Sequence, residues 1–489
     1  MARTPKTQRL PRHARSMASC LRQFLTPQVW KQARCGYKPP RKNSRWEFHH
    51  LILVLLAMTW SLGESTTERF EMARGIVVIC RAKRRRAGKT AGGFQKALCR
   101  LPMRPLVALA AALRGRLIAL LGDDLFHAGF IPLGCDGSRL ECCCNDELLA
   151  RMGKAGKASK VKATKASKVK ATKASKARRA SRIKARQAEQ AFCSPAMWVT
   201  AVVHLTTGVP WSWMLGKGNA SERDHLRKLL PTLPKRALVV ADAGYDGYDL
   251  AAAILNSGAS FLIRMSSKSR FFVDDPTDPE RFEQGPVKYW PQSARQAGLP
   301  ALQLRLIRVR SRRKGKDRKR GADVWLLTNV DAGQMSKTQA ASFYRLRWEN
   351  EGLFRSYKRT LSKVHLVGRT VRSVHREAYG SLLACQLLLA QGAWASRAAR
   401  PRDVTVTPCS VRKAILAVRN ELKAVMKPDR RVSYQDRLAQ SMRERRQRTS
   451  KKMKREWPQR TPHKPPKPPI LLTMNEKEKA LFSRLNAIQ

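Results

Sequence analysis

Acidic residues are scarce in this chain of 489 residues, in which 35 Asp and Glu face 98 Lys and Arg and the formal net charge is +63. Such an excess of positive charge repels itself, so we expect a polyanionic partner. An anionic membrane surface fits poorly, because no amphipathic lipid anchor accompanies the charge. Nucleic acid is the partner that this composition favours.

Long apolar runs are also missing. The longest, residues 51–60, is about half of a bilayer span, so it predicts a buried helix. The basic N-terminus is not followed by an apolar stretch with a cleavage site, which argues against a secretory signal. We therefore expect a cytoplasmic protein with no membrane partner.

Cysteine pairs with the spacing of a zinc site are absent as well. Most of the eleven cysteines are scattered, and the adjacent Cys142, Cys143 and Cys144 have poor geometry for three ligands of one tetrahedral ion. Reduced, mostly structural thiols are the economical interpretation.

The length suggests about three domains, and the composition divides the chain accordingly. Residues 1–129 are helical in pattern and basic, residues 130–390 alternate strand-like and helical segments, and residues 391–489 form a basic C-terminal region and tail. The first region is either a small domain that binds DNA ends or a basic helical scaffold. In the last, residues 427–469 are basic and Pro-rich, which predicts an extended linker or a DNA-binding tail.

A low-complexity insertion interrupts the middle region at residues 150–190. The eight residues 157–164 repeat identically as 165–172, are rich in Lys and Ala, and contain no acid. Such a tract has too little apolar surface to fold alone, so we expect it to be disordered when free. It either grips DNA or is a tolerated expansion of a surface loop.

The middle region has the element order of a mixed α/β fold. Apolar runs predict three strands, a helix, a strand, a helix and a fifth strand, followed by a β-rich insertion at residues 265–335 and then by helices. The segments are 130–135, 197–205, 209–215, 221–233, 237–241, 247–255 and 260–264, with later helices around Glu351 and at about 374–390.

Residues 344–358 carry the most informative pattern of the chain. Wound as a helix, Tyr344, Arg347, Glu351 and Lys358 fall within an arc of about 60°, beside an apolar face. One carboxylate thus shares a face with two cations and a phenol, which suits a site for a metal ion and a phosphodiester. The alternative on this pattern alone is a salt-bridged surface helix.

Two aspartates follow apolar strands in the same region. Asp136 ends the first predicted strand and Asp242 the fourth. A single Asp at a strand end is usually a cap or turn residue. Two of them plus Glu351, on three separate elements, are a more specific set. Such hard oxygen ligands suit Mg²⁺, and two ions about 4 Å apart can activate a water or 3′-hydroxyl for phosphodiester displacement.

These residues resemble the bacterial DDE transposases of the insertion-sequence "four" family. Tyr344, Arg347, Glu351 and Lys358 match that family's Y-x2-R-x3-E-x6-K signature, and the blocks around Asp136 and Asp242 are similar to its two aspartate blocks. The resemblance spans about residues 130–390. It implies an RNase H-like catalytic core with a β-rich insertion, and cut-and-paste transposition by a homodimer on paired transposon ends.

The resemblance also implies roles for single residues. Asp136, Asp242 and Glu351 would be the catalytic triad that binds Mg²⁺, for which Mn²⁺ can substitute. Tyr344, Arg347 and Lys358 would bind DNA phosphates near the cut end. Trp325 resembles a tryptophan of the β-rich insertion on which a flipped base stacks, with burial in a core as the alternative.

We therefore expect a metal-dependent enzyme that cleaves and joins double-stranded DNA at transposon ends and target, in the bacterial cytoplasm and associated with the nucleoid. Two alternatives remain: an RNase H-fold nuclease without joining activity, and a non-enzymatic basic protein that compacts DNA. The second leaves the ordered acidic triad unexplained.

Overall fold

The computed structural model describes the chain in separate stretches. They are residues 17–38, 44–61, 65–80, 87–153, 195–275, 281–310, 323–362, 365–399, 409–424, 434–439 and 467–486, with residue 63. The low-complexity repeats, most of the basic tract 427–469 and part of the β-rich insertion lie outside the described residues.

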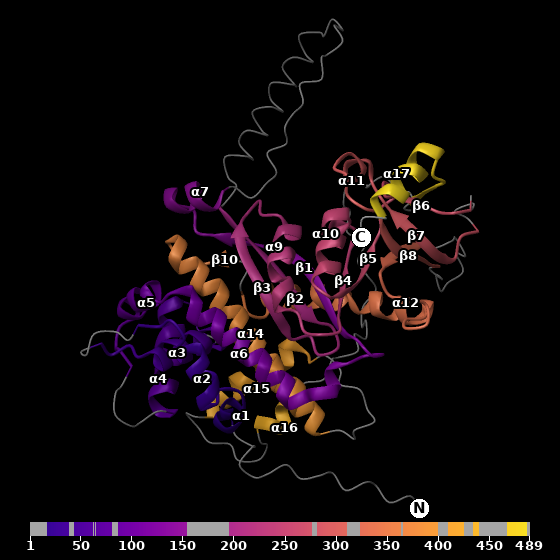
Figure 1. Cartoon of the computed structure of the whole chain (residues 1–489). Coiled ribbons are helices and arrows are strands. Elements are labelled where there is room, and N and C mark those ends of the chain that lie inside the picture. The colour runs from indigo at the N-terminus through magenta and orange to yellow at the C-terminus, as the bar shows by residue number, and fades with distance from the viewer. Residues whose placement is uncertain are drawn as a thin grey trace, which may run out of the picture.

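One mixed β-sheet runs through the middle of the molecule (Figure 1). In the described ranges its strand order is β11-β6-β7-β8-β9-β5-β4-β1-β2-β3, with β10 paired to β1. The strands are β1 (Ile131–Cys142), β2 (Ala196–His204), β3 (Pro210–Lys217), β4 (Ala237–Ala241), β5 (Ser260–Arg264), β6 (Arg270–Phe272), β7 (Gln284–Tyr289), β8 (Leu302–Val309), β9 (Val324–Thr328), β10 (His365–Leu366) and β11 (Ile470–Leu472).

The centre of this sheet follows the predicted order closely. β4 and β5 have the predicted bounds, because each is a short apolar run that is buried on both faces and flanked by turns. β1 differs: it continues to Cys142, so Asp136 lies within the strand and not at its end as predicted. The polar residues after Asp136 remain in the strand because β2 pairs with them as far as Glu141.

Helices cover both faces of the central strands. On one face lie α9 (Glu222–Leu229) and α10 (Tyr248–Asn256), whose Leu226 and Ile254 share a core with Leu133 of β1. The other face is covered by α12 (Lys337–Leu346), α13 (Trp348–Arg359) and α14 (Val371–Ala398). Because side chains alternate along a strand, the residues of β1 divide between these two layers.

The N-terminal helices join the second layer. They are α1 (Met17–Phe24), α2 (Pro27–Ala33), α3 (Phe48–Trp60), α4 (Thr66–Cys80), α5 (Ala91–Arg100) and α6 (Met103–Leu121), and α7 (Asp146–Met152) follows β1. They surround α14 together with α15 (Val411–Ala424) and α16 (Tyr434–Ala439) (Figure 1). The predicted boundary at residue 390 falls inside α14, and residues 17–121 share one hydrophobic core with it.

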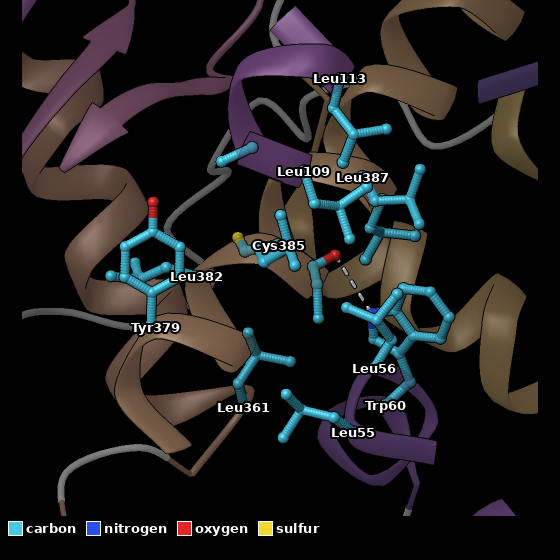
Figure 2. Close-up of a cluster of buried hydrophobic side chains, with 14 of the residues drawn as sticks. Leu55, Leu56, Trp60, Leu109, Leu113, Leu361, Tyr379, Leu382, Cys385 and Leu387 are labelled. Carbon is cyan, nitrogen blue, oxygen red and sulfur yellow. Dashed lines mark hydrogen bonds between the residues drawn. The ribbon is translucent and has the colours of Figure 1, made fainter. Parts of the chain in front are cut away.

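This shared core combines aliphatic and aromatic side chains. Figure 2 shows Leu55 and Trp60 of α3 facing Leu382 and Leu387 of α14, with Leu109 of α6 beside them. The Trp60 indole N–H donates to the carbonyl of Ala384 at 3.3 Å. The run 51–60 is therefore a buried helix, as predicted. Within the described ranges, Met103–Leu125 is long and apolar enough to cross a membrane by length and composition, and its Leu109 and Leu113 are buried in this same core.

The β-rich insertion lies at the other end of the sheet and contains β6 to β9 with α11 (Gln292–Gln296). The C-terminal segment returns to it. β11 pairs in parallel with β6, and α17 (Glu476–Asn486) packs its Phe482 ring 6.0 Å from that of Trp290. The end of the chain therefore completes the insertion (Figure 1).

Candidate active site

The two aspartates of the predicted triad lie on neighbouring strands. β1 and β4 are parallel, and their last registered pair is Gly134 with Val240. Asp136 and Asp242 each follow that pair by two residues, so both side chains are directed to the face covered by α12 and α13. Adjacent strands are about 4.8 Å apart. The register therefore brings the two carboxylates together, although Asp136 lies within its strand.

Backbone hydrogen bonds hold one oxygen of each aspartate. The Oδ1 of Asp136 accepts from the N–H of Gly137 at 2.8 Å. The Oδ1 of Asp242 accepts from the N–H of Gly244 at 2.8 Å, as the cap of the 3-10 turn Ala243–Tyr245. The other oxygen of each side chain accepts no hydrogen bond from the described residues and is available to a ligand.

Glu351 reaches this face from α13. The helix packs along β1 with Leu353, Phe354 and Tyr357 buried, which confirms the predicted apolar face. Close contact anchors its first turn: a Cβ on Gly134 would lie 2.5 Å from the Asn350 amide nitrogen. Glycine at this position lets α13 approach the strand and puts Glu351 beside the aspartates.

The pKa of Asp136 shows that the three acids interact. It is raised to about 6, first by burial, and further by the charges of Asp242 and Glu351. The Gly137 hydrogen bond and the Arg347 charge lower it. Mutual repulsion among carboxylates is the expected consequence of gathering them in one half-buried place. The structure therefore brings Asp136, Asp242 and Glu351 into electrostatic contact.

Arg347 is a cation beside this acidic group. It is 8% exposed, and its Nη2 lies 3.3 Å from the Oε1 of Glu351. It occupies a turn between α12 and α13, so the continuous helix predicted for 344–358 is interrupted there. Its Nε is buried without a hydrogen-bond partner among the described residues. Arg347 thus has a donor left for a ligand while it neutralises Glu351.

The donor set fits a divalent cation of the Mg²⁺ type. Carboxylate oxygens are the ligands such an ion prefers. Its charge would offset both the burial that mainly raises the pKa of Asp136 and the smaller effects of Asp242 and Glu351. Within the stretches that the structure covers, no three His, Cys, Asp or Glu side chains form a ready-made metal-binding group. The ion pair with Arg347 explains part of this, because Glu351 would have to exchange that cation for the metal.

Tyr344 and Lys358, the other two residues of the signature, lie on α12 and α13 respectively. Tyr344 lies beside Arg347, whose guanidinium carbon is 5.7 Å from the centre of the tyrosine ring, and its hydroxyl is buried without a partner among the described residues. Lys358 lies about two helical turns beyond Glu351. Burial lowers the pKa of Lys358, and the charge of Glu141 raises it, so this lysine is near the far end of β1.

The two tryptophans of the region differ in exposure. Trp325 is 4% exposed, with its ring centre 5.8 Å from that of Phe282 and the Arg308 guanidinium 5.5 Å away. This burial agrees with the alternative in which Trp325 is a core residue and does not stack on a base. Trp348 is 57% exposed beside Arg347, because the break at residue 347 separates it from the apolar face of α13.

Two further residues at the site were not predicted. Arg264 ends β5, and because Ala241 pairs with Ile263, it continues the row of Asp136 and Asp242. Glu222 begins α9, and its carboxylate lies against Gly137. Their proximity follows from strand register and helix placement, which no motif in the sequence signals.

Fold and site together define a mixed α/β protein with an acidic site at the end of β4. The helix that carries the third acid covers this site, and a buried arginine precedes that helix. Residues 165–387 match the protein family described as "Transposase DDE domain". The match includes Asp242 and Glu351 and begins after Asp136, so the place of Asp136 rests on the register and its pKa. This region is thus similar to a transposase DDE domain, and the chain is an enzyme of the DDE transposase class.

The remaining comparisons are distant. No curated protein matches the chain. Among solved structures, it is similar to a piggyBac transposase in a synaptic complex with hairpin DNA, with 12% identity and a TM-score of 0.38 over 90% of this chain and 88% of that one. Folds that differ this much do not support inference from one to the other.

Proposed function

We propose that the chain is the transposase of an insertion sequence of the "four" family, which cuts the ends of its element and joins them to target DNA by a cut-and-paste route. The observation that supports the proposal is the register that brings Asp136 and Asp242 side by side, with Glu351 close enough for its charge to add to the effect of burial on the pKa of Asp136. The order of strands and helices around them supports an RNase H-like core.

Asp136, Asp242 and Glu351 would hold Mg²⁺, for which Mn²⁺ can substitute. Such an ion would activate a water or 3′-hydroxyl and stabilise the leaving oxygen of the phosphodiester. The protein's part is to position the acids. Backbone N–H groups fix one oxygen of each aspartate, and the contact between Gly134 and Asn350 fixes the height of α13 above β1.

Arg347 would couple DNA binding to the assembly of the site. It is paired with Glu351 at 3.3 Å, and a DNA phosphate would compete for the same guanidinium. Transfer of Arg347 to phosphate would release Glu351 to bind the ion. Arg347→Ala should therefore strengthen Mn²⁺ binding to the DNA-free protein while it weakens DNA binding; weaker Mn²⁺ binding in this variant would argue against the exchange.

Other side chains near the acids suit the DNA backbone. Tyr344 and Lys358 would contact phosphates, as the signature implies, and Arg264 lies in the same row as Asp242. The exposed indole of Trp348 is a flat surface next to Arg347 that suits stacking on a base or sugar. These contacts would surround the phosphate that is cut.

The partner would be double-stranded DNA, as transposon ends and as target, bound by a homodimer on paired ends. Large positive charge supports this partner, because each phosphate neutralised releases counterions. The corresponding location is the bacterial cytoplasm, in association with the nucleoid. A nuclease without joining activity would use the same acids, and a strand-transfer assay with pre-cut ends separates the two.

The proposal is tested by cleavage of the element's own ends in Mg²⁺. Glu351→Gln should abolish cleavage and leave binding of the ends within several-fold, because the amide keeps the shape of the side chain and loses its charge. Glu349→Gln on the same helix is the matched control and should keep activity. Loss of both cleavage and end binding in Glu351→Gln would make Glu351 a structural residue.

A further inference from the structure

A fourth carboxylate lies behind the aspartate pair. Glu222 is the first residue of α9, whose N-cap Ser221 accepts from the N–H of Asp224 at 3.3 Å. A Cβ placed on Gly137 would lie 2.6 Å from the Oε1 of Glu222 and 2.7 Å from its carboxyl carbon. Gly137 follows Asp136 directly, so only glycine there allows this acid to reach the strand next to Asp136.

Glu222 approaches from the other side of the sheet. Successive residues of a strand face opposite ways, so Gly137 opens toward α9 while Asp136 faces α12 and α13. The carboxylate thus lies beneath the strand that carries Asp136. It adds a negative charge on the side of the sheet opposite to the three acids. The face where DNA would bind stays uncovered.

The same helix turn also holds the segment that carries Asp242. The hydroxyl of Tyr245 forms a hydrogen bond with Glu222, and Tyr245 is the fully buried last residue of the turn that follows Asp242. Arg223, which follows Glu222 in α9, donates from its Nε to the carbonyl of Gly244 at 2.9 Å. The start of α9 therefore contacts both aspartate-bearing segments.

Charge links Glu222 to the pair as well. The pKa of Glu222 is raised, first by burial and further by the charges of Asp136 and Asp242, against the lowering effect of the Tyr245 hydrogen bond. Within the described part of the chain, the one ion pair formed by Asp136, Asp242, Glu351 and Glu222 is that of Glu351 with Arg347. Asp136, Asp242 and Glu222 therefore form no ion pair with a cation of the described residues.

We propose that Glu222 is a positioning residue of the cation site: held between Gly137 and Tyr245, it adds negative charge behind Asp136 and Asp242 and strengthens their binding of a divalent cation. The inference rests on the proposed function, which places the cation on that pair. Partners of this kind, outside the ligands themselves, typically change metal affinity by about 10- to 100-fold.

The test measures Mn²⁺ binding to the full-length, DNA-free protein by calorimetry, together with the unfolding temperature. Glu222→Gln keeps the shape and a hydrogen-bond acceptor for Tyr245 and removes the charge, so it should weaken Mn²⁺ binding about tenfold. Tyr245→Phe keeps the charge and removes the hydrogen bond, so it should lower the unfolding temperature and change binding less than threefold. Asp224→Asn is the matched control, because it removes a charge from the same helix turn at an exposed side chain paired with Arg227.

The outcomes separate the possibilities. Unchanged Mn²⁺ binding in Glu222→Gln, or an equal loss in Glu222→Gln and Asp224→Asn, overturns the inference. An equal loss in Glu222→Gln and Tyr245→Phe also overturns it, since the role is then purely structural. If the unaltered protein binds no Mn²⁺, or if Asp136→Asn leaves binding intact, the proposed function itself fails at its metal site.

Discussion

At the scale of single residues, His204 illustrates how burial keeps a histidine ring neutral. Its Nε2 lies 2.9 Å from the carbonyl of Leu125, and its Nδ1 lies 2.8 Å from the hydroxyl of Thr207. A carbonyl only accepts, so Nε2–H donates to Leu125 and Nδ1 accepts from Thr207. The neutral ring is satisfied, and burial lowers the pKa of His204 to about 4.

This histidine should make the fold sensitive to acid. An unfolded histidine has a pKa of about 6.5, so between pH 6.5 and 4 the unfolded chain binds more protons than the folded one. Stability is therefore present above pH 6.5 and falls as the pH drops toward 4, by on the order of 3 kcal/mol for this residue. Thermal unfolding of the full chain across this range, compared with His204→Gln, measures it; an equal pH dependence in the variant would contradict the assignment.

Trp325 should behave as a core residue. Its ring lies against Phe282 and beneath Arg308, so Trp325→Ala should cost about 3–5 kcal/mol of stability, in the range of buried aromatic truncations. We expect first-strand nicking and hairpin formation to be impaired equally. A normal unfolding temperature with a selective loss of hairpin product would instead support base stacking, and Trp325→Phe provides the conservative comparison.

Motifs in the sequence mark some residues of the candidate site. An apolar run precedes Asp242 and a four-residue signature contains Glu351, so both can be proposed from the sequence, and their catalytic roles stay predictions. Glu222 and Arg264 were missed because they meet the site through a glycine contact and a strand register. Such contacts depend on tertiary structure and leave no local pattern.

At the scale of elements, strands bounded by turns were predictable and strands completed by pairing were not. β4 and β5 have the expected bounds. β1 is longer than expected, since its second half alternates polar and apolar residues and is held by β2 and β10. The predicted face of 344–358 was correct for its buried residues, although Arg347 interrupts the helix.

Gly134 should be the most sensitive glycine of the sheet. A Cβ there would meet the Asn350 amide at 2.5 Å and Leu205 at 2.6 Å, so Gly134→Ala should destabilise the protein by about 1–3 kcal/mol through overpacking and should reduce cleavage by displacing α13. Gly115→Ala is the matched control in α6, where nothing lies within 4 Å, and it should stabilise by up to about 1 kcal/mol. Equal unfolding temperatures for the two variants would contradict the close contact.

At the scale of the whole molecule, distant segments complete one another. The N-terminal helices surround α14, and the C-terminal β11 and α17 attach to the insertion. Composition could not predict either of these contacts. The predicted domain boundaries lie where the composition changes along the chain, whereas the hydrophobic packing continues across them. In the segment 467–486, the apolar residues Leu471, Met474, Leu481, Phe482 and Leu485 pack against the core of the insertion.

The low-complexity insertion lies outside the described residues, but the ends that flank it are held together. The N–H of Ala196 donates to the carbonyl of Gly153 at 3.3 Å, so residues 156–186 should be removable without opening the sheet. Their removal should leave cleavage of specific ends intact and flatten the salt dependence of nonspecific DNA binding, by about one unit of slope for each phosphate that is no longer neutralised. An uncharged linker of equal length is the control; an unchanged slope would mean that these lysines do not bind DNA.

The central claim is that three acids, carried by β1, the end of β4 and α13, together bind a divalent cation. Anomalous diffraction from crystals of the full chain with its element ends and Mn²⁺ tests it most directly. We predict a manganese peak at about 2.0–2.3 Å from carboxylate oxygens of Asp136, Asp242 and Glu351. A peak bound elsewhere, or Glu351 still paired with Arg347 while DNA and Mn²⁺ are present, would contradict this claim.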